Sequence, residues 1–241
     1  MMKTGKKRLT PDFFSSLTND VDFFIVRHGQ SEGNAGKILQ GRQEYQLSEL
    51  GRFQAAARGR ALKLALTGAQ KPLLFSSPMN RARETAFIIA EQAGLGEPVI
   101  LDVLIEMSLG IWTGKSWDEV KNDDPALWAD FMARSWDAIP EAESSADIYE
   151  RALRAWAVMR DAAQTAGAER VVVVTHGGLI QWLLKCSFQC RSWFPLLPIS
   201  NCGQFKLCVK PHPTRQSAYL GWEEIDTPIP DQRPEPQGFP A

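Results

Sequence analysis

The chain has 241 residues, which suits one large domain or two small ones. Hydrophobic residues make up 44% of it, enough for an ordinary core, and this composition excludes a disordered chain. The formal net charge is -1, whereas a protein that binds nucleic acid usually has an excess of basic residues, so a nucleic-acid partner is disfavoured. No apolar run approaches the roughly 20 residues of a membrane span.

The two ends of the chain differ in composition from the middle. Residues 1–20 begin with basic residues but have no apolar segment behind them, which predicts a mobile arm rather than a secretion signal. Residues 21–227 contain no linker and are expected to form a single domain. The proline-containing tail, residues 228–241, is expected to be disordered. The four cysteines match no zinc pattern, so we expect reduced thiols and a cytoplasmic protein.

The first half of the domain alternates between strand and helix patterns. Residues 23–26 (FFIV) predict a buried strand. Residues 48–66 predict a helix that Ser48 caps, with an apolar face of Leu50, Phe53, Ala57, Ala61 and Leu64. A second strand is expected at 72–78. The next helix would have Ser77 as its cap and Pro78 at its first position, an apolar face of Ala82, Ala86, Ile89 and Ala93, and an end at Gly94.

The second half continues the pattern. Residues 98–107 predict a third extended segment, and the Trp-rich residues 112–136 predict short helices. A long helix should begin near Ser144, bury Ile148, Ala152, Ala155 and Met159 and end at Gly167. Residues 171–175 (VVVVT) predict a buried strand, and 177–186 its helix. Two late strands, QFKLCVK and AYLGWEEI, either form a hairpin within the fold or pair across the edge of a homodimer.

Strands that alternate with helices predict an α/β fold, a three-layer α/β/α sandwich with a mostly parallel central sheet. In such sheets, ligands bind beyond the carboxyl ends of the strands. Polar side chains follow each predicted strand at that edge, and they are Arg27, His28, Ser77, Arg81, Glu106 and His176.

Two histidines, two arginines and a glutamate at one sheet edge predict an anion site. Arginine matches phosphate oxygens with two parallel hydrogen bonds, and the N-terminus of the helix that begins near Pro78 would add its dipole. The glycines Gly29, Gly177 and Gly178 would let the backbone approach a ligand closely.

These motifs together resemble the histidine phosphatase superfamily, the phosphoglycerate mutase-like family. The matching pieces span most of the chain in the family's order, and they are RHGQSEGN at 27–34, QGRQEYQLSELGRFQA at 40–55, SSPMNRARETA at 76–86, EMSLGIWTG at 106–114 and VVVVTHGG at 171–178. The resemblance implies a phosphomonoester hydrolase that acts on a small phosphorylated metabolite without a metal or a cofactor.

The resemblance also implies a role for each matched residue. His28 would be the nucleophile and form a phosphohistidine. Arg27, Arg81 and His176 would hold the phosphoryl oxygens. Glu106 would donate the proton to the leaving oxygen. Substrate contacts are implied for Asn34, Gln40, Gly41 and Gly177, whereas Arg83 is either a further contact or an ordinary surface residue.

Two alternatives to a phosphatase remain at this stage. A cofactor-dependent phosphoglycerate mutase usually has Trp-Asn where this chain has Gly33-Asn34, and it has a longer basic and aromatic insertion after the glutamate motif. A non-catalytic binding module on the same scaffold would typically have lost the nucleophile or its partners, all of which this chain retains.

The residues around the expected pocket mouth depart from the family pattern. Glu44 and Tyr45 stand near the place where relatives often have an aspartate, and Arg42 either reaches an anionic group of the substrate or is an ordinary solvated arginine. The Trp-rich segment is expected to cover the leaving group, with most of its rings in core packing. The third histidine, His212, lies between two prolines and is expected to have no catalytic role.

Overall fold

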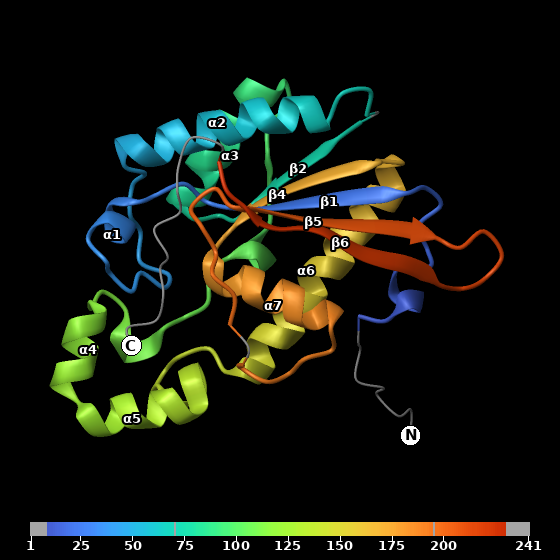
Figure 1. Cartoon of the computed structure of the whole chain (residues 1–241). Coiled ribbons are helices and arrows are strands. Elements are labelled where there is room, and N and C mark those ends of the chain that lie inside the picture. The colour runs from blue at the N-terminus through green and yellow to red at the C-terminus, as the bar shows by residue number, and fades with distance from the viewer. Residues whose placement is uncertain (1–8, 70, 195, 230–241) are drawn as a thin grey trace.

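The computed structural model describes residues 9–69, 71–194 and 196–229, and a six-stranded sheet runs through its middle in the order β3-β2-β4-β1-β5-β6 (Figure 1). The first four strands in this order are parallel, and the last two are antiparallel to their neighbours. The strands are β1 (Val21–Arg27), β2 (Leu73–Ser76), β3 (Val99–Ile100), β4 (Arg170–Thr175), β5 (Gln204–Pro211) and β6 (Ala218–Thr227).

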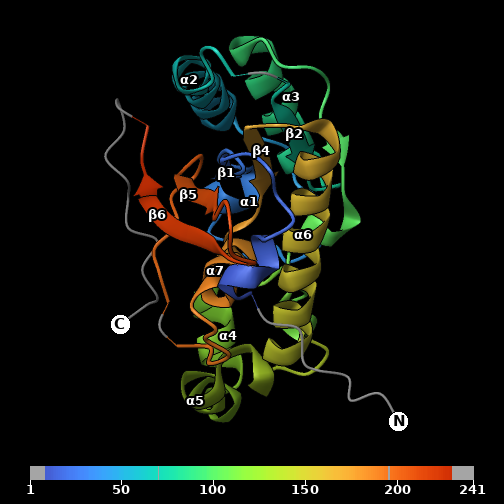
Figure 2. The same ribbon diagram turned by 90° about the vertical axis from the view of Figure 1, so that its right-hand side faces the viewer.

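The helices form a layer on each face of the sheet (Figure 1). They are α1 (Glu32–Ala35), α2 (Glu49–Ala65), α3 (Asn80–Ala93), α4 (Trp117–Asp123), α5 (Pro125–Arg134), α6 (Ser145–Ala166) and α7 (Gly177–Ser187), with the 3-10 turns η1 (Pro11–Phe14), η2 (Asp102–Leu104), η3 (Gly110–Trp112) and η4 (Ser135–Ala138). Figure 1 and Figure 2 both place α4 and α5 at the end of the molecule away from α2 and α3. The predicted α/β/α sandwich is confirmed.

Strand alternation divides the core between the two layers, because successive side chains of a strand point to opposite faces of a sheet. Phe23 and Ile25 of β1 pack in the larger cluster, which includes residues of α6 and α7. Phe24 and Val26 pack in the smaller cluster with residues of α2 and α3. β1 is therefore apolar on both faces and fully internal. Its last residue, Arg27, lies where the buried strand meets the polar sheet edge.

The apolar face predicted for α2 is wrong. The side chains of Leu50, Phe53 and Leu64 are exposed, and Leu64 retains 78% of its accessible surface. The helix turns its glycines inward instead: a Cβ on Gly51 would lie 2.0 Å from the Gln30 carbonyl oxygen, and one on Gly59 would lie 2.6 Å from Gln92. Close approach of the backbone, rather than large apolar side chains, fixes which face of α2 is buried.

Two other local predictions differ from the structure. α3 begins at Asn80, two residues later than expected, with Met79 as its N-cap residue, so Ser77 does not cap it. The extended segment predicted at 98–107 contains only the two residues of β3, and η2 follows at once. The chain turns away from the sheet edge after Ile100, so Glu106 does not end a strand.

The remaining elements of the second half follow the prediction. Ser144 caps α6, where its side chain accepts a hydrogen bond from the Asp147 backbone N–H, and Gly167 ends the helix in the left-handed region. The Trp-rich segment forms η3, α4, α5 and η4. β5 and β6 form the expected antiparallel hairpin, and β6 is the outer strand of the described sheet.

The described parts of the two ends pack against the domain. Leu9, Phe14 and Leu17 are buried, so residues 9–20 differ from the predicted arm, and residues 1–8 lie outside the described residues. Ile229 is also buried, whereas 230–241, most of the predicted disordered tail, lie outside the described residues. All four cysteines are free thiols, and no described helix combines the length and the apolar character needed to cross a membrane.

Candidate active site

The end of β1 places the His28 imidazole at the floor of a pocket. The His28 side chain is 2% exposed. Its Nδ1 lies 2.7 Å from the Gly29 carbonyl oxygen, and because a carbonyl can only accept, Nδ1 is the protonated nitrogen. Nε2 therefore carries the lone pair, and it accepts a hydrogen bond from Arg81 Nε over 3.3 Å. The fold thus fixes both the tautomer and the orientation of the ring.

Arg81, in the first turn of α3, is held in place by the loop before α2. Its Nη1 donates to the Gln43 carbonyl oxygen over 2.9 Å, and its Nη2 donates to the Gly41 carbonyl oxygen over 2.8 Å. Gly41 has a φ of +48°, a backbone conformation that glycine adopts readily, and this turns its carbonyl toward the guanidinium. The guanidinium is 1% exposed and faces His28, so a dense positive charge lies beside the imidazole.

The second histidine after a strand lies beside the first, as the parallel pairing of β1 and β4 predicts. His176 follows β4, and its ring centroid lies 5.1 Å from that of His28. Its Nε2 and the Ser77 Oγ form a hydrogen bond of 2.7 Å. Its Nδ1 is buried and has no hydrogen-bond partner among the described residues. A buried ring nitrogen without a partner is costly, and an oxygen of a bound anion would satisfy it.

Burial and positive charge determine the protonation of both rings. Desolvation lowers the pKa of His28 well below its ordinary value of 6.5, and the charges of Arg81 and Arg27 lower it further. Desolvation also lowers the pKa of His176 well below 6.5, followed by the effect of Arg81. Each imidazole is therefore neutral near pH 7, and the His28 ring has a lone pair available for attack.

Glu106 reaches the same pocket from the loop after η2. Its Oε1 accepts hydrogen bonds from the Met107 and Leu179 backbone N–H groups over 2.8 and 3.2 Å, and its Oε2 accepts one from the Gly178 N–H over 3.1 Å. The N-terminus of α7 thus positions the carboxyl group. A Cβ on Gly178 would lie 2.5 Å from Oε1, so only glycine leaves room for it.

The loop that carries Glu106 is held by two arginines that share the Glu143 carboxylate. Arg42 donates to the Glu106 carbonyl oxygen over 2.9 Å and pairs with Glu143 over 3.1 Å. Arg151 of α6 pairs with Glu143 over 2.7 Å and also donates to the carbonyl oxygens of Val103 and Ile105. Arg42 is 43% exposed, as expected of a solvated arginine, and it also links the Glu106 loop to Glu143.

The predicted substrate contacts divide into those that line the pocket and one that does not. Asn34, Gln40, Gly41 and Gly177 all line it. Gln40 accepts a hydrogen bond from Ser31 Oγ over 2.8 Å, which holds its side chain in place. The remaining candidate, Arg83, is exposed on α3 and is not among the lining residues.

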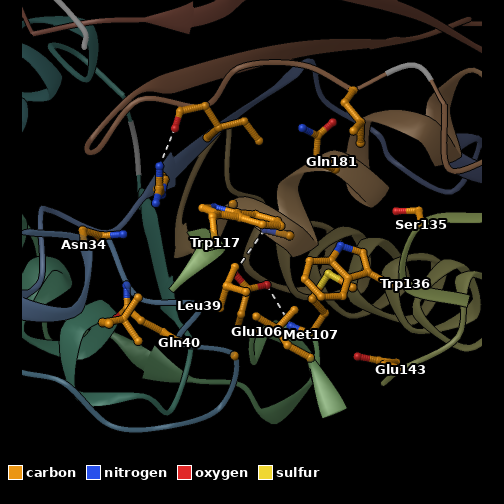
Figure 3. Close-up of a pocket in the computed structure, with 18 of the residues that line it drawn as sticks. Asn34, Leu39, Gln40, Glu106, Met107, Trp117, Ser135, Trp136, Glu143 and Gln181 are labelled. Atoms are coloured by element: carbon orange, nitrogen blue, oxygen red, sulfur yellow. Dashed lines mark hydrogen bonds between the residues drawn. The ribbon is translucent and has the colours of Figure 1, made fainter. Parts of the chain in front are cut away.

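The pocket has a volume of about 660 Å³ and extends well beyond the histidines. Figure 3 shows Asn34 and Gln40 on one side, Trp136 and Gln181 on the other, and Glu106 between them. Trp117 and Trp136 belong to the lining, whereas Trp112 and Phe131 are buried behind them. Ring centroids in this aromatic cluster lie 4.9 to 6.2 Å apart, so part of the Trp-rich segment packs as a core and part forms a pocket wall.

Ser77, which the sequence placed at this edge and also predicted as a helix cap, holds His176. Two further residues of the site were missed in the sequence. Thr85 Oγ accepts a hydrogen bond from the Gly29 backbone N–H over 3.0 Å and supports the loop of His28, a role that no sequence pattern predicted. Lys185 lines the outer pocket wall, and its burial lowers its pKa to about 8. Lys185 lies one helical turn after Gln181 and Trp182, which also face the pocket, and this spacing could have identified it in the sequence.

Glu44 also has a defined structural role. Its carboxylate accepts a hydrogen bond from the Asn80 backbone N–H over 3.0 Å, at the N-terminus of α3, and thereby satisfies a free donor of that helix. The exposed His212 ring accepts hydrogen bonds from the backbone of its own loop, far along the chain from the other two histidines. Among the described residues, no group of three or more histidine, cysteine, aspartate or glutamate side chains could hold a metal ion.

Comparisons with known proteins agree with this geometry. A family model described as "Histidine phosphatase superfamily (branch 1)" matches residues 23–217. A glucosyl-3-phosphoglycerate phosphatase of Mycolicibacterium vanbaalenii is 38% identical over 65% of this chain and 69% of its own length. A metal-independent phosphoserine phosphatase of Arabidopsis thaliana is 32% identical over 66% of each chain.

Solved structures show the same similarity. A mycobacterial glucosyl-3-phosphoglycerate phosphatase in complex with VO3 superposes with a TM-score of 0.72 at 28% identity, over 86% of this chain and 99% of that one. Two further relatives, the 2,3-bisphosphoglycerate-dependent phosphoglycerate mutases of two Methylorubrum extorquens strains, are each 30% identical over 66% of this chain and 76% of their own length. The relatives named as phosphatases support the prediction of a phosphomonoester hydrolase.

Proposed function

The chain belongs to the histidine phosphatase superfamily, as its motifs predicted, and we propose that it hydrolyses small phosphomonoesters through a phosphohistidine on His28. One observation carries this proposal: His28 presents a neutral Nε2 lone pair to a pocket in which Arg81 lies 3.3 Å away. A nucleophile and a cation in contact are what an anionic phosphoryl group requires.

In the first step, the phosphoryl group enters between His28 and the cationic side chains. Arg81 Nε–H then donates to a phosphoryl oxygen instead of to His28 Nε2, and the freed lone pair attacks phosphorus. Arg27, which lines the pocket and whose charge lowers the pKa of His28, and the unpaired Nδ1 of His176 bind the remaining oxygens. The N–P bond forms as the P–O bond to the leaving group breaks.

Proton transfer accompanies both steps. Glu106 acts as the proton donor to the leaving oxygen, which departs as an alcohol. The resulting carboxylate then takes a proton from a water molecule whose oxygen attacks phosphorus. The N–P bond breaks, His28 regains its lone pair, and inorganic phosphate is released. The three backbone N–H groups around Glu106 hold its carboxyl group in place through both steps.

The relatives indicate the substrate class. Those named as phosphatases act, by their names, on glucosyl-3-phosphoglycerate and phosphoserine, so we propose a small phosphorylated metabolite for this chain as well. A phosphoglycerate mutase remains the alternative because two mutases are also similar. A cytoplasmic location, the lack of a nucleic-acid partner and a homodimer through the edge strand β6 stay predictions.

The test combines turnover with trapping of the intermediate. The protein should hydrolyse an aryl phosphate without added metal, and quenching in alkaline denaturant should leave phosphate on the chain that later acid treatment releases. His28→Ala should lower the rate by a factor on the order of 10⁴ or more and abolish trapping. The control is His212→Ala, whose ring is exposed in a distant loop and which should keep full activity.

Two outcomes would change the proposal. Full activity in folded His28→Ala would overturn the mechanism. Conversion of 3-phosphoglycerate to 2-phosphoglycerate faster than its hydrolysis would instead favour the mutase alternative.

A further inference from the structure

One wall of the pocket is a single face of α7. The helix begins at Gly177, beside the histidines, and its inward positions recur with the helical period as Gly178, Gln181, Trp182 and Lys185. Lys185 is eight residues from Gly177, and at 1.5 Å per residue the two positions are about 12 Å apart along the helix axis. The pocket therefore extends from the phosphoryl end to a lysine about two turns away.

Lys185 is a buried cation without a carboxylate partner among the described residues. Its side chain is 6% exposed, and no ion pair of the described chain includes it. The Nζ donates to the carbonyl oxygens of Ser192 and Trp193, and it lies 4.5 Å from the Trp182 ring centroid. Lysine is almost never buried unless it is paired, and an ammonium has three N–H donors, of which two carbonyls use two.

The surroundings of Lys185 indicate what kind of ligand group would accept the third N–H of its ammonium. The pocket that contains it and the histidines has large aromatic and aliphatic lining residues, Trp117, Trp136, Ile148 and Leu197, beside polar ones such as Ser135 and Glu143. Gln181 is fixed by hydrogen bonds with the Leu197 backbone, so it adds a held amide to this wall. Apolar lining surfaces with a buried cation at one end of the α7 face fit a ligand with an apolar or planar middle and a terminal anion.

We propose that Lys185 binds a second negative charge of the substrate, about 12 Å from the phosphoryl group, so that the enzyme selects extended phosphomonoesters with a distal carboxylate. This inference rests on the proposed function, because it takes the histidine end as the phosphoryl site. It specifies the leaving group: long, apolar or planar along its middle, and anionic at its tip. Lys185 is thus a specificity-determining residue that acts on binding rather than on the chemical step.

The experiment uses alkyl phosphates that differ in only one feature at a time. One pair spans about 12 Å and ends in a carboxylate or in its neutral primary amide. A second pair is short, and a simple aryl phosphate reports the chemistry alone. For the wild type, we expect kcat/KM on the long carboxylate to exceed that on the long amide by about tenfold, mainly through KM, and the short pair to show no such preference.

The variant isolates the charge of Lys185. Lys185→Met keeps the length of the side chain and should remove the preference for the long carboxylate, with kcat on the aryl phosphate unchanged. Lys185→Arg, which keeps the charge, should retain most of the preference. The matched control is Lys63→Met on the exposed side of α2, which should behave as wild type.

The outcomes separate the two proposals. If the wild type does not hydrolyse the aryl phosphate, the proposed function fails. If it hydrolyses the aryl phosphate but treats the long carboxylate and the long amide alike, the inference about Lys185 is overturned and the proposed function stands. An equal loss on acid and amide in Lys185→Met would show that the lysine only holds the 192–193 backbone. The wild-type preference alone decides the matter if the variant does not fold.

Discussion

The two ends of the pocket are built by different means. The phosphoryl end takes Arg27, His28 and His176 from the ends of paired, buried strands, and their positions follow from the sheet. The leaving-group end takes its walls from short helices and from α7, where rings pack against one another. A sheet edge fixes its residues through backbone register, whereas an aromatic wall depends on side-chain packing. The phosphoryl end therefore suits a reaction that stays the same, and the leaving-group end suits a substrate selectivity that can change.

The largest expected effect in the comparison comes from a change at the phosphoryl end. Gly178→Ala puts a Cβ 2.5 Å from Glu106 Oε1, so the carboxyl group must move. A displacement of this kind can cost about 10²-fold, and we expect that loss in kcat on alkyl phosphates of every length. Aryl phosphates, whose leaving groups need less help from a proton, should lose less. Steady-state kinetics on both classes checks the prediction.

The control for this variant is Gly96→Ala, because no atom lies within 4 Å of a Cβ at Gly96. It should match the wild type on all substrates. Equal losses on alkyl and aryl phosphates in Gly178→Ala would contradict a role of Glu106 in protonating the leaving oxygen.

A second prediction concerns the pH dependence of stability, which the two neutral histidines should dominate. Their pKa values in the folded protein lie well below the ordinary 6.5, so between 6.5 and those lowered values the unfolded chain binds more protons. The contribution of the two neutral histidines to the free energy of unfolding is therefore fully present above pH 6.5. It falls as the pH decreases below 6.5, by up to about 1.4 kcal/mol per pH unit for each histidine.

Urea unfolding of the wild type and of the double variant His28→Ala, His176→Ala, at pH 7 and at lower pH, measures this slope. The double variant should lose stability less steeply as the pH falls below 6.5. Parallel slopes for the two proteins would mean that the histidines are not held neutral by the fold, and the phosphoryl end would lose its neutral nucleophile.

The smallest expected effect lies at the leaving-group end. Trp136→Phe keeps an aromatic ring in the cluster with Trp112 and Phe131 but trims the wall that Trp136 forms. We expect KM for long substrates to change about fivefold, because a small change of an apolar wall is worth about 1 kcal/mol at the low end of its range. The value of kcat on an aryl phosphate should stay the same. A large fall in that kcat would show that the two ends are not separable in this way.

The sequence predicted the phosphoryl end better than the outer end for physical reasons. Arg27, His28 and His176 follow apolar runs that can only be buried strands, and parallel strands bring their ends together. The sequence placed Glu106 at this edge as the end of a third strand, and its role came from the family resemblance. That strand ends at Ile100, so a loop carries Glu106 to the pocket instead. The sequence pattern predicted that Leu50 and Phe53 of α2 would be buried, but both are exposed. Close backbone contacts at Gly51 outweigh the apolar period of this helix.

Lys185 shows why the outer end could not be predicted. A lysine in the last turn of a helix is typical of a solvated side chain that compensates the helix dipole. Its burial arises from the chain segment that contains Ser192 and Trp193, which folds back over α7 and supplies two carbonyl oxygens. That contact depends on tertiary structure, and no local pattern of residues encodes it.

The carboxylate of Glu143 has a consequence for how this enzyme can diverge. Glu143 lies just before α6 and forms ion pairs with both Arg42 and Arg151. Both arginines also donate hydrogen bonds to backbone carbonyl oxygens of the segment 103–106. Glu106, the proposed proton donor, is thereby held by α6 and by the loop before α2, and not by the tryptophan wall. Substitutions can accumulate in that wall without shifting the carboxyl group of Glu106. A descendant of this chain could acquire a new substrate by such changes and keep its old chemistry.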